Sequence, residues 1–247
     1  MAIEKSKRKA ADLSDSLAVP RGMSYFPTMA CHYLVRPAPA KPSLTDPSDP
    51  AWQAAEILEV ASFHERTGTH RPVTRARLLH DPEGVFVRFD VADRFVRSVH
   101  VNYQDPVSRD SCVEWFVQTG ADKGYFNFET NCGGTLLLHY CEPALQPKRV
   151  TPVDPLWAAK VPVCSSMPRT VEPEVSGPVD WTLAYFVPFA LLEHYAGPLG
   201  KIRGATWRAN FYKIGSGTSH PHWASWSPIA SGTSFHQPEF FGEIMFL

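Results

Sequence analysis

Short runs that alternate apolar with polar residues, separated by turn residues and prolines, constrain this fold more than any other feature. Residues 74–80 and 85–91 (VFVRFDV) flank the segment DPEG at 81–84, and this arrangement predicts a β-hairpin. The chain has 247 residues, and its 23 prolines interrupt any long helical stretch. Its 7 Trp, 8 Tyr and 15 Phe residues favour strands. The pattern therefore predicts a fold made mainly of β-strands.

Six further segments are predicted strands: 112–118, 125–131, 135–140, 181–187, 205–213 and 241–246. The segment PFALLEHYAG, which opens at Pro188 and reaches Gly197, predicts the best helix of the chain. A second short helix is predicted from Asp49-Pro50 onward. Because strands follow strands with little helix between them, we expect an all-β, antiparallel β-sandwich with one or two short helices.

The chain is predicted to consist of a flexible N-terminal tail, residues 1–32, and a single domain, residues 33–247. The tail contains the basic run KSKRK, but its next ten residues include two aspartates and lack the apolar core of a secretory signal. We therefore expect a cytoplasmic protein. The Pro-rich segment 36–50 is predicted to be extended and to wrap the domain.

Charge and motifs exclude several classes of function. The chain has 24 Lys and Arg residues against 25 Asp and Glu, a formal net charge of −1, which argues against a nucleic-acid partner. No apolar run approaches the roughly 20 residues of a membrane span. GxGxxG, P-loop and GxSxG motifs are absent from the sequence. The five cysteines form no CxxC pair and are predicted to be reduced thiols. Nothing in the pattern indicates an oligomeric state.

Polar residues alternate on three of the predicted strands, as they would in a binding site: Glu114, Asn127, Glu129, Arg208 and Asn210. If Val113 faces the core, Glu114 lies on the opposite face of its strand. The same alternation is also typical of the solvated face of a half-exposed strand. A binding site and a solvated face therefore both remain open for these residues.

Aromatic and histidine residues gather in the C-terminal segments HPHWASW (220–226) and FHQPE (235–239). Aromatic rings cover the apolar face of a sugar, while carboxylates, amides and Arg bind its hydroxyls. Trp226, Phe235 and His236 are the predicted contributors here, with Trp223 and Tyr212 as further platforms. A metal site is an alternative, with His220 and His222 as ligands and His236 or Glu239 as the third.

Taken in order, these segments resemble the family 9 carbohydrate-binding modules and their family-9-like relatives. The resemblance covers about residues 33–247 and rests on the lead-in with Asp49-Pro50-Ala51-Trp52 and on the segments VFVRFDV, RDSCVEWFV, YFNFETNCGG, WTLAYFVPF, WRANFYK, HPHWASW and FHQPEFFGEIMF. It implies a β-sandwich of the DOMON-like type that holds a sugar between two aromatic side chains.

The resemblance also implies roles for single residues. Glu114 falls where those modules place a sugar-binding carboxylate, and Asn127 stands at the position of their hydroxyl-reading Arg. Their two sandwiching tryptophans fall near Val107 and Phe235. Some of these modules carry structural calcium, so calcium is a possible cofactor here, although no ligands can be assigned to it.

The leading hypothesis is a non-catalytic carbohydrate-binding protein for a mono- or oligosaccharide. Its predicted ligand-binding residues are Glu114, Asn127, Glu129, Arg208, Asn210, Trp226, Phe235 and His236. One alternative is a sugar-active enzyme on the same sandwich, using Glu114 or Glu129 with His236 or His222 in acid–base chemistry. Another is haem binding, as in DOMON-like relatives, which needs axial ligands such as Met with His or Lys.

Overall fold

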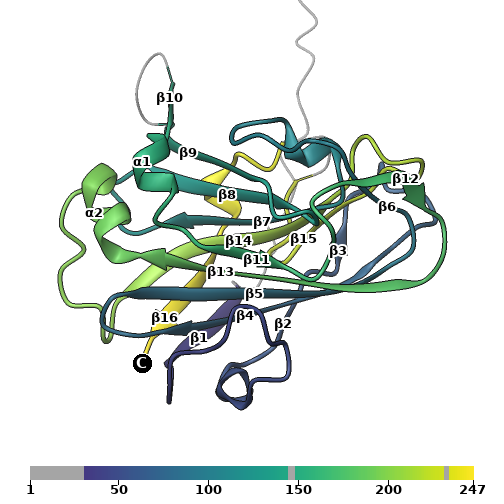
Figure 1. The fold of residues 1–247 in the computed structure, drawn as a ribbon. Coiled ribbons are helices and arrows are strands. Elements are labelled where there is room, and N and C mark those ends of the chain that lie inside the picture. The colour runs from purple at the N-terminus through teal and green to yellow at the C-terminus, as the bar shows by residue number, and fades with distance from the viewer. Residues whose placement is uncertain (1–30, 144–147, 231–233) are drawn as a thin grey trace, which may run out of the picture.

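Two β-sheets stacked face to face form the body of the protein in the computed structural model (Figure 1). The structure describes residues 31–143, 148–230 and 234–247. Most of the predicted N-terminal tail, residues 1–30, lies outside this range. The predicted sandwich is confirmed, and strands account for most of the regular structure.

The first sheet carries the polar strands singled out in the sequence. Its strands, in spatial order, are β10 (Arg149–Pro152), β9 (Leu136–Glu142), β8 (Tyr125–Asn131), β7 (Cys112–Gln118), β14 (Thr206–Ile214), β16 (Gly242–Phe246) and β1 (His32–Pro37). Two short strands extend it beside the end of β14, namely β15 (Trp223–Ser225) and β3 (Ser62–Phe63).

The second sheet contains β1, β4 (Val73–His80), β5 (Gly84–Asp93), β13 (Val179–Pro188) and β11 (Val163–Ser165), with β2 (Leu58–Glu59) beside β4. A separate pair, β6 (Val96–Ser98) and β12 (Val171–Val175), lies at one end of the sandwich. The helices α1 (Pro155–Ala158) and α2 (Phe189–Ala196) lie at the other end (Figure 1). Three 3₁₀ turns cover Pro50–Ala54, Val107–Arg109 and Pro238–Phe240.

Strand β1 belongs to both sheets and is parallel to its neighbours in each. Tyr33 pairs with Ile244 of β16, and Arg36 pairs with Leu79 of β4. Every other strand pair in the described residues is antiparallel. A parallel neighbour requires a long connection, and nearly the whole domain lies between β1 and β16 in the sequence.

The longer predicted elements are confirmed. The turn at 81–84 joins β4 to β5, with His80 opposite Val85. The helix predicted after Pro188 is α2, and it ends where Gly197 adopts a φ of +74°. The helix predicted after Asp49 is a 3₁₀ turn, capped by the Asp49 carboxylate, which accepts from the Ala51 N–H. The strands β1, β2, β3 and β6 have two to six residues and carry too little alternation to be predicted.

The main core lies between the two sheets and is rich in aromatic rings. Trp115 of β7 stacks on Phe128 of β8 with ring centroids 5.5 Å apart. Phe128 in turn reaches Tyr185 of the other sheet at 6.1 Å. These contacts hold the two layers together, because large buried aromatic side chains remove the most apolar surface from water.

A second apolar cluster covers the opposite face of β7, β8 and β14. Its largest members are Phe116, Tyr125, Tyr212, Phe235 and Phe241. As a result, every residue of β7 and β8 is buried, whether it faces inward or outward. The polar alternation on these strands therefore does not mark a solvated face, which was one of the two interpretations of the sequence.

No helix in the parts of the chain that the structure describes has the length and apolar character to span a membrane. The five cysteines are free thiols, and Cys112, Cys132 and Cys141 are buried. This agrees with the prediction of reduced thiols, and the three buried thiols pack as small apolar side chains.

The outer cluster should stabilise the fold as a core does. We expect Phe116→Ala to lower the free energy of unfolding by about 3–5 kcal/mol, because it removes a fully buried ring. Leu156→Ala, at a side chain that is 79% exposed, should change it by less than about 0.5 kcal/mol. Urea denaturation measures both values. A loss below about 1 kcal/mol for Phe116→Ala would contradict a packed outer cluster.

Candidate functional site

Two glutamates face each other on the outer side of the first sheet. The strand register pairs Glu114 of β7 with Glu129 of β8. Both side chains point away from the main core, because their neighbours Val113 and Trp115 pack into it. Glu114 is 2% exposed and Glu129 is 7% exposed. The structure therefore places two acids side by side in a site with little access to water.

Burial dominates the electrostatics of this pair. Burial, and then the neighbouring Glu129 charge, hold the pKa of Glu114 well above its usual range. Burial raises the pKa of Glu129 to about 7, although a hydrogen bond from Asn127 opposes the change. Near neutral pH the pair therefore remains at least partly protonated, because the fold disfavours two adjacent carboxylates.

Asn127 positions one of the two acids. Its Nδ2 donates to Glu129 Oε1 at 2.7 Å, and its Oδ1 accepts from the backbone N–H of His139 at 2.8 Å. Glu114, in contrast, makes no side-chain hydrogen bond to any residue that the structure describes. A nine-tenths buried polar group without a partner is uncommon and requires an explanation.

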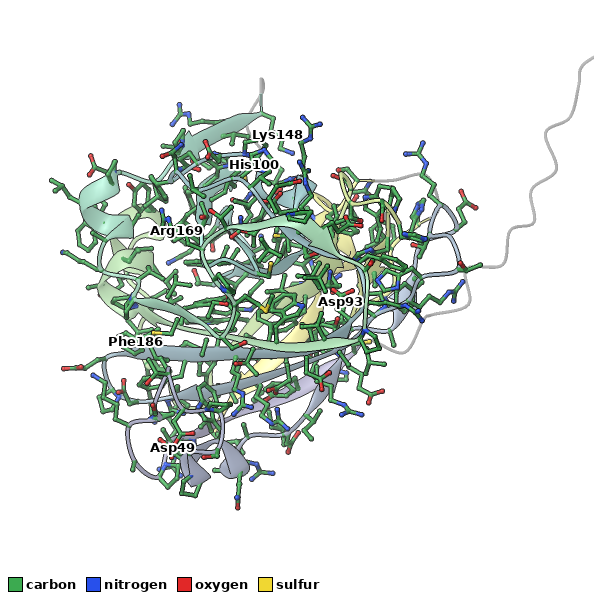
Figure 2. The ribbon with its side chains drawn as sticks, turned by 45° about the vertical axis from the view of Figure 1, so that its right-hand side comes forward. Asp49, Asp93, His100, Lys148, Arg169 and Phe186 are labelled. Atoms are coloured by element: carbon green, nitrogen blue, oxygen red, sulfur yellow. The ribbon has the colours of Figure 1, made fainter. Side chains whose placement is uncertain are left out.

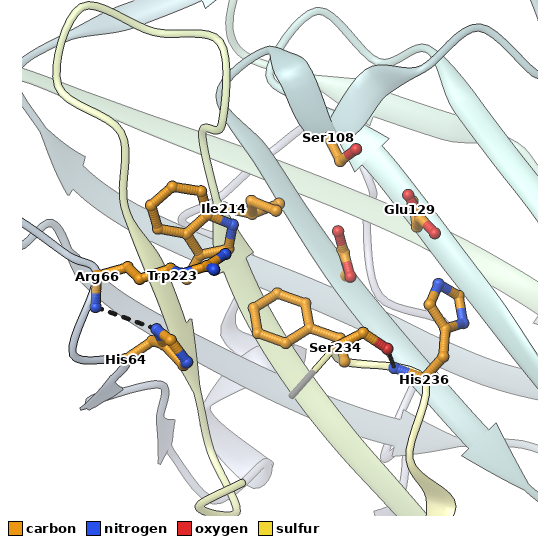
Figure 3. Close-up of a pocket in the computed structure, with 10 residues that line it drawn as sticks. His64, Arg66, Ser108, Glu129, Ile214, Trp223, Ser234 and His236 are labelled. Atoms are coloured by element: carbon orange, nitrogen blue, oxygen red, sulfur yellow. Dashed lines mark hydrogen bonds between the residues drawn. The ribbon is translucent and has the colours of Figure 1, made fainter. Parts of the chain in front are cut away.

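The explanation lies in a pocket of about 250 Å³ above the pair (Figure 3). This volume lies just below the range typical of small-molecule sites, which begins at roughly 300 Å³. Ten residues line it: His64, Arg66, Ser108, Glu114, Glu129, Ile214, Trp223, Ser234, Phe235 and His236. Glu129 and His236 lie on one side of the pocket, and Arg66 and Trp223 lie on the other.

Two aromatic residues of the pocket are held by contacts of their own. The Phe235 ring stacks on Tyr212 with centroids 4.1 Å apart, and the Tyr212 hydroxyl donates to the Phe235 carbonyl at 3.1 Å. Trp223 lies on β15, where its backbone N–H donates to Thr67 Oγ1 and its carbonyl accepts from the His64 N–H. The Phe235 ring therefore does not have to be ordered when a ligand enters, which reduces the entropic cost of binding.

His236 contributes a neutral ring. Its Nδ1 lies 3.0 Å from the Tyr125 hydroxyl. Burial lowers the pKa of His236 to about 4, and burial raises the pKa of Tyr125. Both side chains are uncharged near pH 7 and can exchange only neutral hydrogen bonds with a ligand.

The structure brings five of the predicted site residues together and places three elsewhere. Glu114, Glu129, Phe235 and His236 line the pocket, and Asn127 supports Glu129. The remaining three, described next, are Arg208, Asn210 and Trp226.

These three residues hold the covering segments to the sheet. Arg208 donates to the carbonyl oxygens of Glu239 and Phe241 at 3.1 and 3.0 Å. Asn210 exchanges two hydrogen bonds with the Ser227 backbone. Trp226 packs edge-on against Phe211 at 5.7 Å. None of the three lines the pocket, and their contact with a ligand stays a prediction.

Some lining residues were missed by the sequence interpretation. His64 and Arg66 follow the two-residue strand β3, and Ser108 lies in a 3₁₀ turn. These positions carry no periodic signal, and only their distant partners bring them to the pocket. Val107, where the resemblance placed an aromatic wall, is fully buried in the outer cluster and does not line the pocket.

A separate buried cluster lies on the other side of β14. His70 Nε2 lies 2.8 Å from Asp93 Oδ1, and Lys213 Nζ lies 3.4 Å from Asp93 Oδ2 and 2.7 Å from His222 Nε2. Figure 2 shows Asp93 within the body of the molecule. Burial, and then the Lys213 charge, lower the pKa of His222 to about 3. Lys213 therefore faces its own acid and is turned away from Glu114.

This cluster does not match the metal site suggested by the sequence. Among the described residues, His70, Asp93 and His222 form the one group of three potential ligands whose atoms lie within 4.8 Å of one another. The Lys213 ammonium already contacts two of them, so a cation finds no open position. His220 stacks on Phe95 at 3.6 Å, and His236 lies in the pocket. The predicted set of His220 and His222 with His236 is therefore wrong, and structural calcium stays a prediction without assigned ligands.

A β-sandwich with a small pocket of carboxylates and aromatic rings on one sheet defines a class of ligand-binding modules. Comparison with known families specifies the class further. Residues 42–246 match the model of carbohydrate-binding family 9, and the chain belongs to this family. No curated protein matches the chain.

Solved structures have the same fold. A protein of Bacteroides uniformis, described as a candidate carbohydrate-binding protein, is 27% identical, with a TM-score of 0.79 over 88% of this chain and 100% of its own. A family 9 module of Caldicellulosiruptor kristjanssonii in complex with cellotriose is 15% identical, with a TM-score of 0.59 over 87% and 93% of the two chains. A glucose complex of such a module from the same organism is 14% identical, with a TM-score of 0.59 over 88% and 96%.

The acid pair should make stability depend on pH. Folding raises the pKa of Glu129 from 4.5 to about 7, so the folded state binds this proton more tightly than the unfolded state does. The stability that comes from this proton is fully present below pH 4.5 and is lost as the pH rises through 7. When the pH is raised from 5 to 8, we expect the free energy of unfolding of Glu129→Gln to rise by up to about 3 kcal/mol relative to that of the wild type. Urea denaturation at both pH values measures this difference.

Glu83→Gln, at an exposed turn position, is the matched control and should follow the wild type at both pH values. If the free energies of unfolding of Glu129→Gln and the wild type change equally across this range, Glu129 ionises in the folded protein as it does in water, and the prediction is contradicted.

Proposed function

We propose that this protein binds a mono- or oligosaccharide without transforming it, in the pocket over Glu114 and Glu129. One observation carries the proposal: the Glu114 side chain is 2% exposed, lines the pocket and has no hydrogen-bond partner among the described residues. A ligand with several hydroxyl groups supplies the missing partners.

The remaining walls suit the two surfaces of a sugar ring. Phe235 and Trp223 offer aromatic faces to its C–H groups, while Glu129, His236 and Ser108 offer polar atoms to its hydroxyls. The family and its structural relatives support this assignment, since the Caldicellulosiruptor modules were solved with glucose and with cellotriose.

The catalytic alternative receives less support from the geometry. Glycosidases use two carboxyl groups that flank the scissile bond. Glu114 and Glu129 are cross-strand neighbours on one face of one sheet, and therefore form the same wall of the pocket. Acid–base catalysis by this pair stays a hypothesis that an assay for sugar release during the binding experiments would test.

Haem binding receives no support from the pocket. Neither Met167 nor Met245, the methionines of the described residues, is among the residues that line it. Met245 lies on β16 with 43% of its surface exposed. A Met axial ligand for haem is therefore not available at this site.

Isothermal titration against mono- and oligosaccharides tests the binding function. We expect binding in the micromolar to millimolar range to at least one sugar class, at least tenfold weaker in Glu114→Ala and in Phe235→Ala. The two substitutions remove a hydrogen-bonding group and an aromatic wall, respectively.

Glu83→Gln is the control for the titrations and should bind as the wild type does. Circular dichroism checks that each variant is folded. Unchanged affinity in both folded pocket variants would place the sugar site elsewhere, and no binding of any sugar would contradict the proposed function.

A further inference from the structure

The charges around the two glutamates are unbalanced. Lys213 belongs to the opposite face of the sheet, where its ammonium contacts Asp93 and His222. Arg66 is exposed and lies on the far side of the pocket from Glu129 (Figure 3). Among the described residues, no cationic side chain makes an ion pair with either glutamate.

The other titratable groups near the pair do not supply a positive charge. Burial keeps the pKa of His236 and of His139 below their usual values, so both rings are neutral near pH 7. Burial raises the pKa of the remaining groups, which stay protonated and uncharged: Cys112, Tyr125, Cys141 and Tyr212. Lys148, the residue before β10, is exposed, and its charge adds to burial in lowering the pKa of His236.

A neutral sugar satisfies only part of this site. Its hydroxyls can donate to the carboxyl oxygens, but they leave the repulsion between two buried acids in place. An ammonium group offers three N–H donors and a positive charge in one small volume. It can bond to both glutamates at once and take the place of the bound proton that reduces their negative charge.

We propose that the pocket selects a sugar with a free, protonated amine, an amino sugar whose ammonium group lies between Glu114 and Glu129. This inference rests on the proposed function and specifies its ligand. Phe235 and Trp223 would cover the ring faces, and Asn127 would hold Glu129 toward the ammonium. An N-acetylated sugar has no charge at this nitrogen and adds an acetyl group to a pocket of about 250 Å³.

Binding of an ammonium group should release a proton. In the free protein burial raises the pKa of both glutamates, so the pair remains at least partly protonated near neutral pH. When the ligand enters already protonated, its N–H groups take over the hydrogen bonds, and the proton of the pair leaves to the buffer. No covalent bond in the sugar changes. The measured heat should therefore depend on the ionisation enthalpy of the buffer.

Three β-1,4-linked trimers that differ only at C2 provide the test: cellotriose, the glucosamine trimer and the N-acetylglucosamine trimer. We titrate each at pH 6.5 in 0.15 M salt, in two buffers of different ionisation enthalpy. We expect the free-amine trimer to bind at least tenfold more tightly than the other two, and to release a proton. Hexose, hexosamine and N-acetylhexosamine monomers of the gluco, galacto and manno series extend the comparison to other ring stereochemistries.

Variants separate the pocket from general charge attraction. In Glu129→Gln and in Glu114→Gln the ratio of the affinity for the free-amine trimer to the affinity for cellotriose should fall below threefold. Glu83→Gln removes one exposed negative charge outside the pocket and should retain the full preference. Thermal melting confirms that each variant is folded.

The possible outcomes are distinct. Neutral sugars that bind as tightly as their amine counterparts would overturn the amino-sugar inference and leave carbohydrate binding intact. An amine preference that persists in both glutamate variants would show adventitious charge attraction and would also overturn it. Absence of binding to every sugar would contradict the proposed function itself.

Discussion

Burial of β7 and β8 on both faces is the constraint on which the candidate site depends. One face packs into the main core through Trp115 and Phe128, and the other lies under the outer cluster around Phe116 and Tyr212. A carboxylate on such a strand loses its water, because neither face of β7 or β8 is open to solvent. The raised pKa values of the glutamates and the unpartnered Glu114 both follow from this arrangement.

The covering segments are held by contacts that do not touch the pocket. Arg208 binds the carbonyls of Glu239 and Phe241, and Asn210 binds the Ser227 backbone. These bonds fix the chain on either side of Phe235 and His236, which both line the pocket. On the inner side, Asp93 and His222 contact the buried Lys213, whose charge opposes the rise in the Glu114 pKa but makes no ion pair with Glu114 among the described residues.

The sequence predicts those parts of the molecule that depend on local pattern. The hairpin of β4 and β5 and the acids Glu114 and Glu129 could be identified because long strands alternate with a period of two. The place of Arg66 in the pocket could not be identified from the sequence, because Arg66 follows a strand of only two residues. The contact of His70 with Asp93 and His222 joins distant segments, and no local pattern reports such pairing. Arg208 and Trp226 are residue types that are common in sugar sites, but in this fold they hold covering segments to the sheet and do not line the pocket.

A crystal structure of the protein with a bound sugar tests the central claim most directly. The account predicts that polar atoms of the sugar lie within hydrogen-bond distance, about 2.7–3.2 Å, of the Glu114 and Glu129 carboxyl groups. It also predicts a sugar ring against Phe235 or Trp223. A sugar bound beside Arg208 and Trp226, with the pocket over the two glutamates filled only by water, would contradict it.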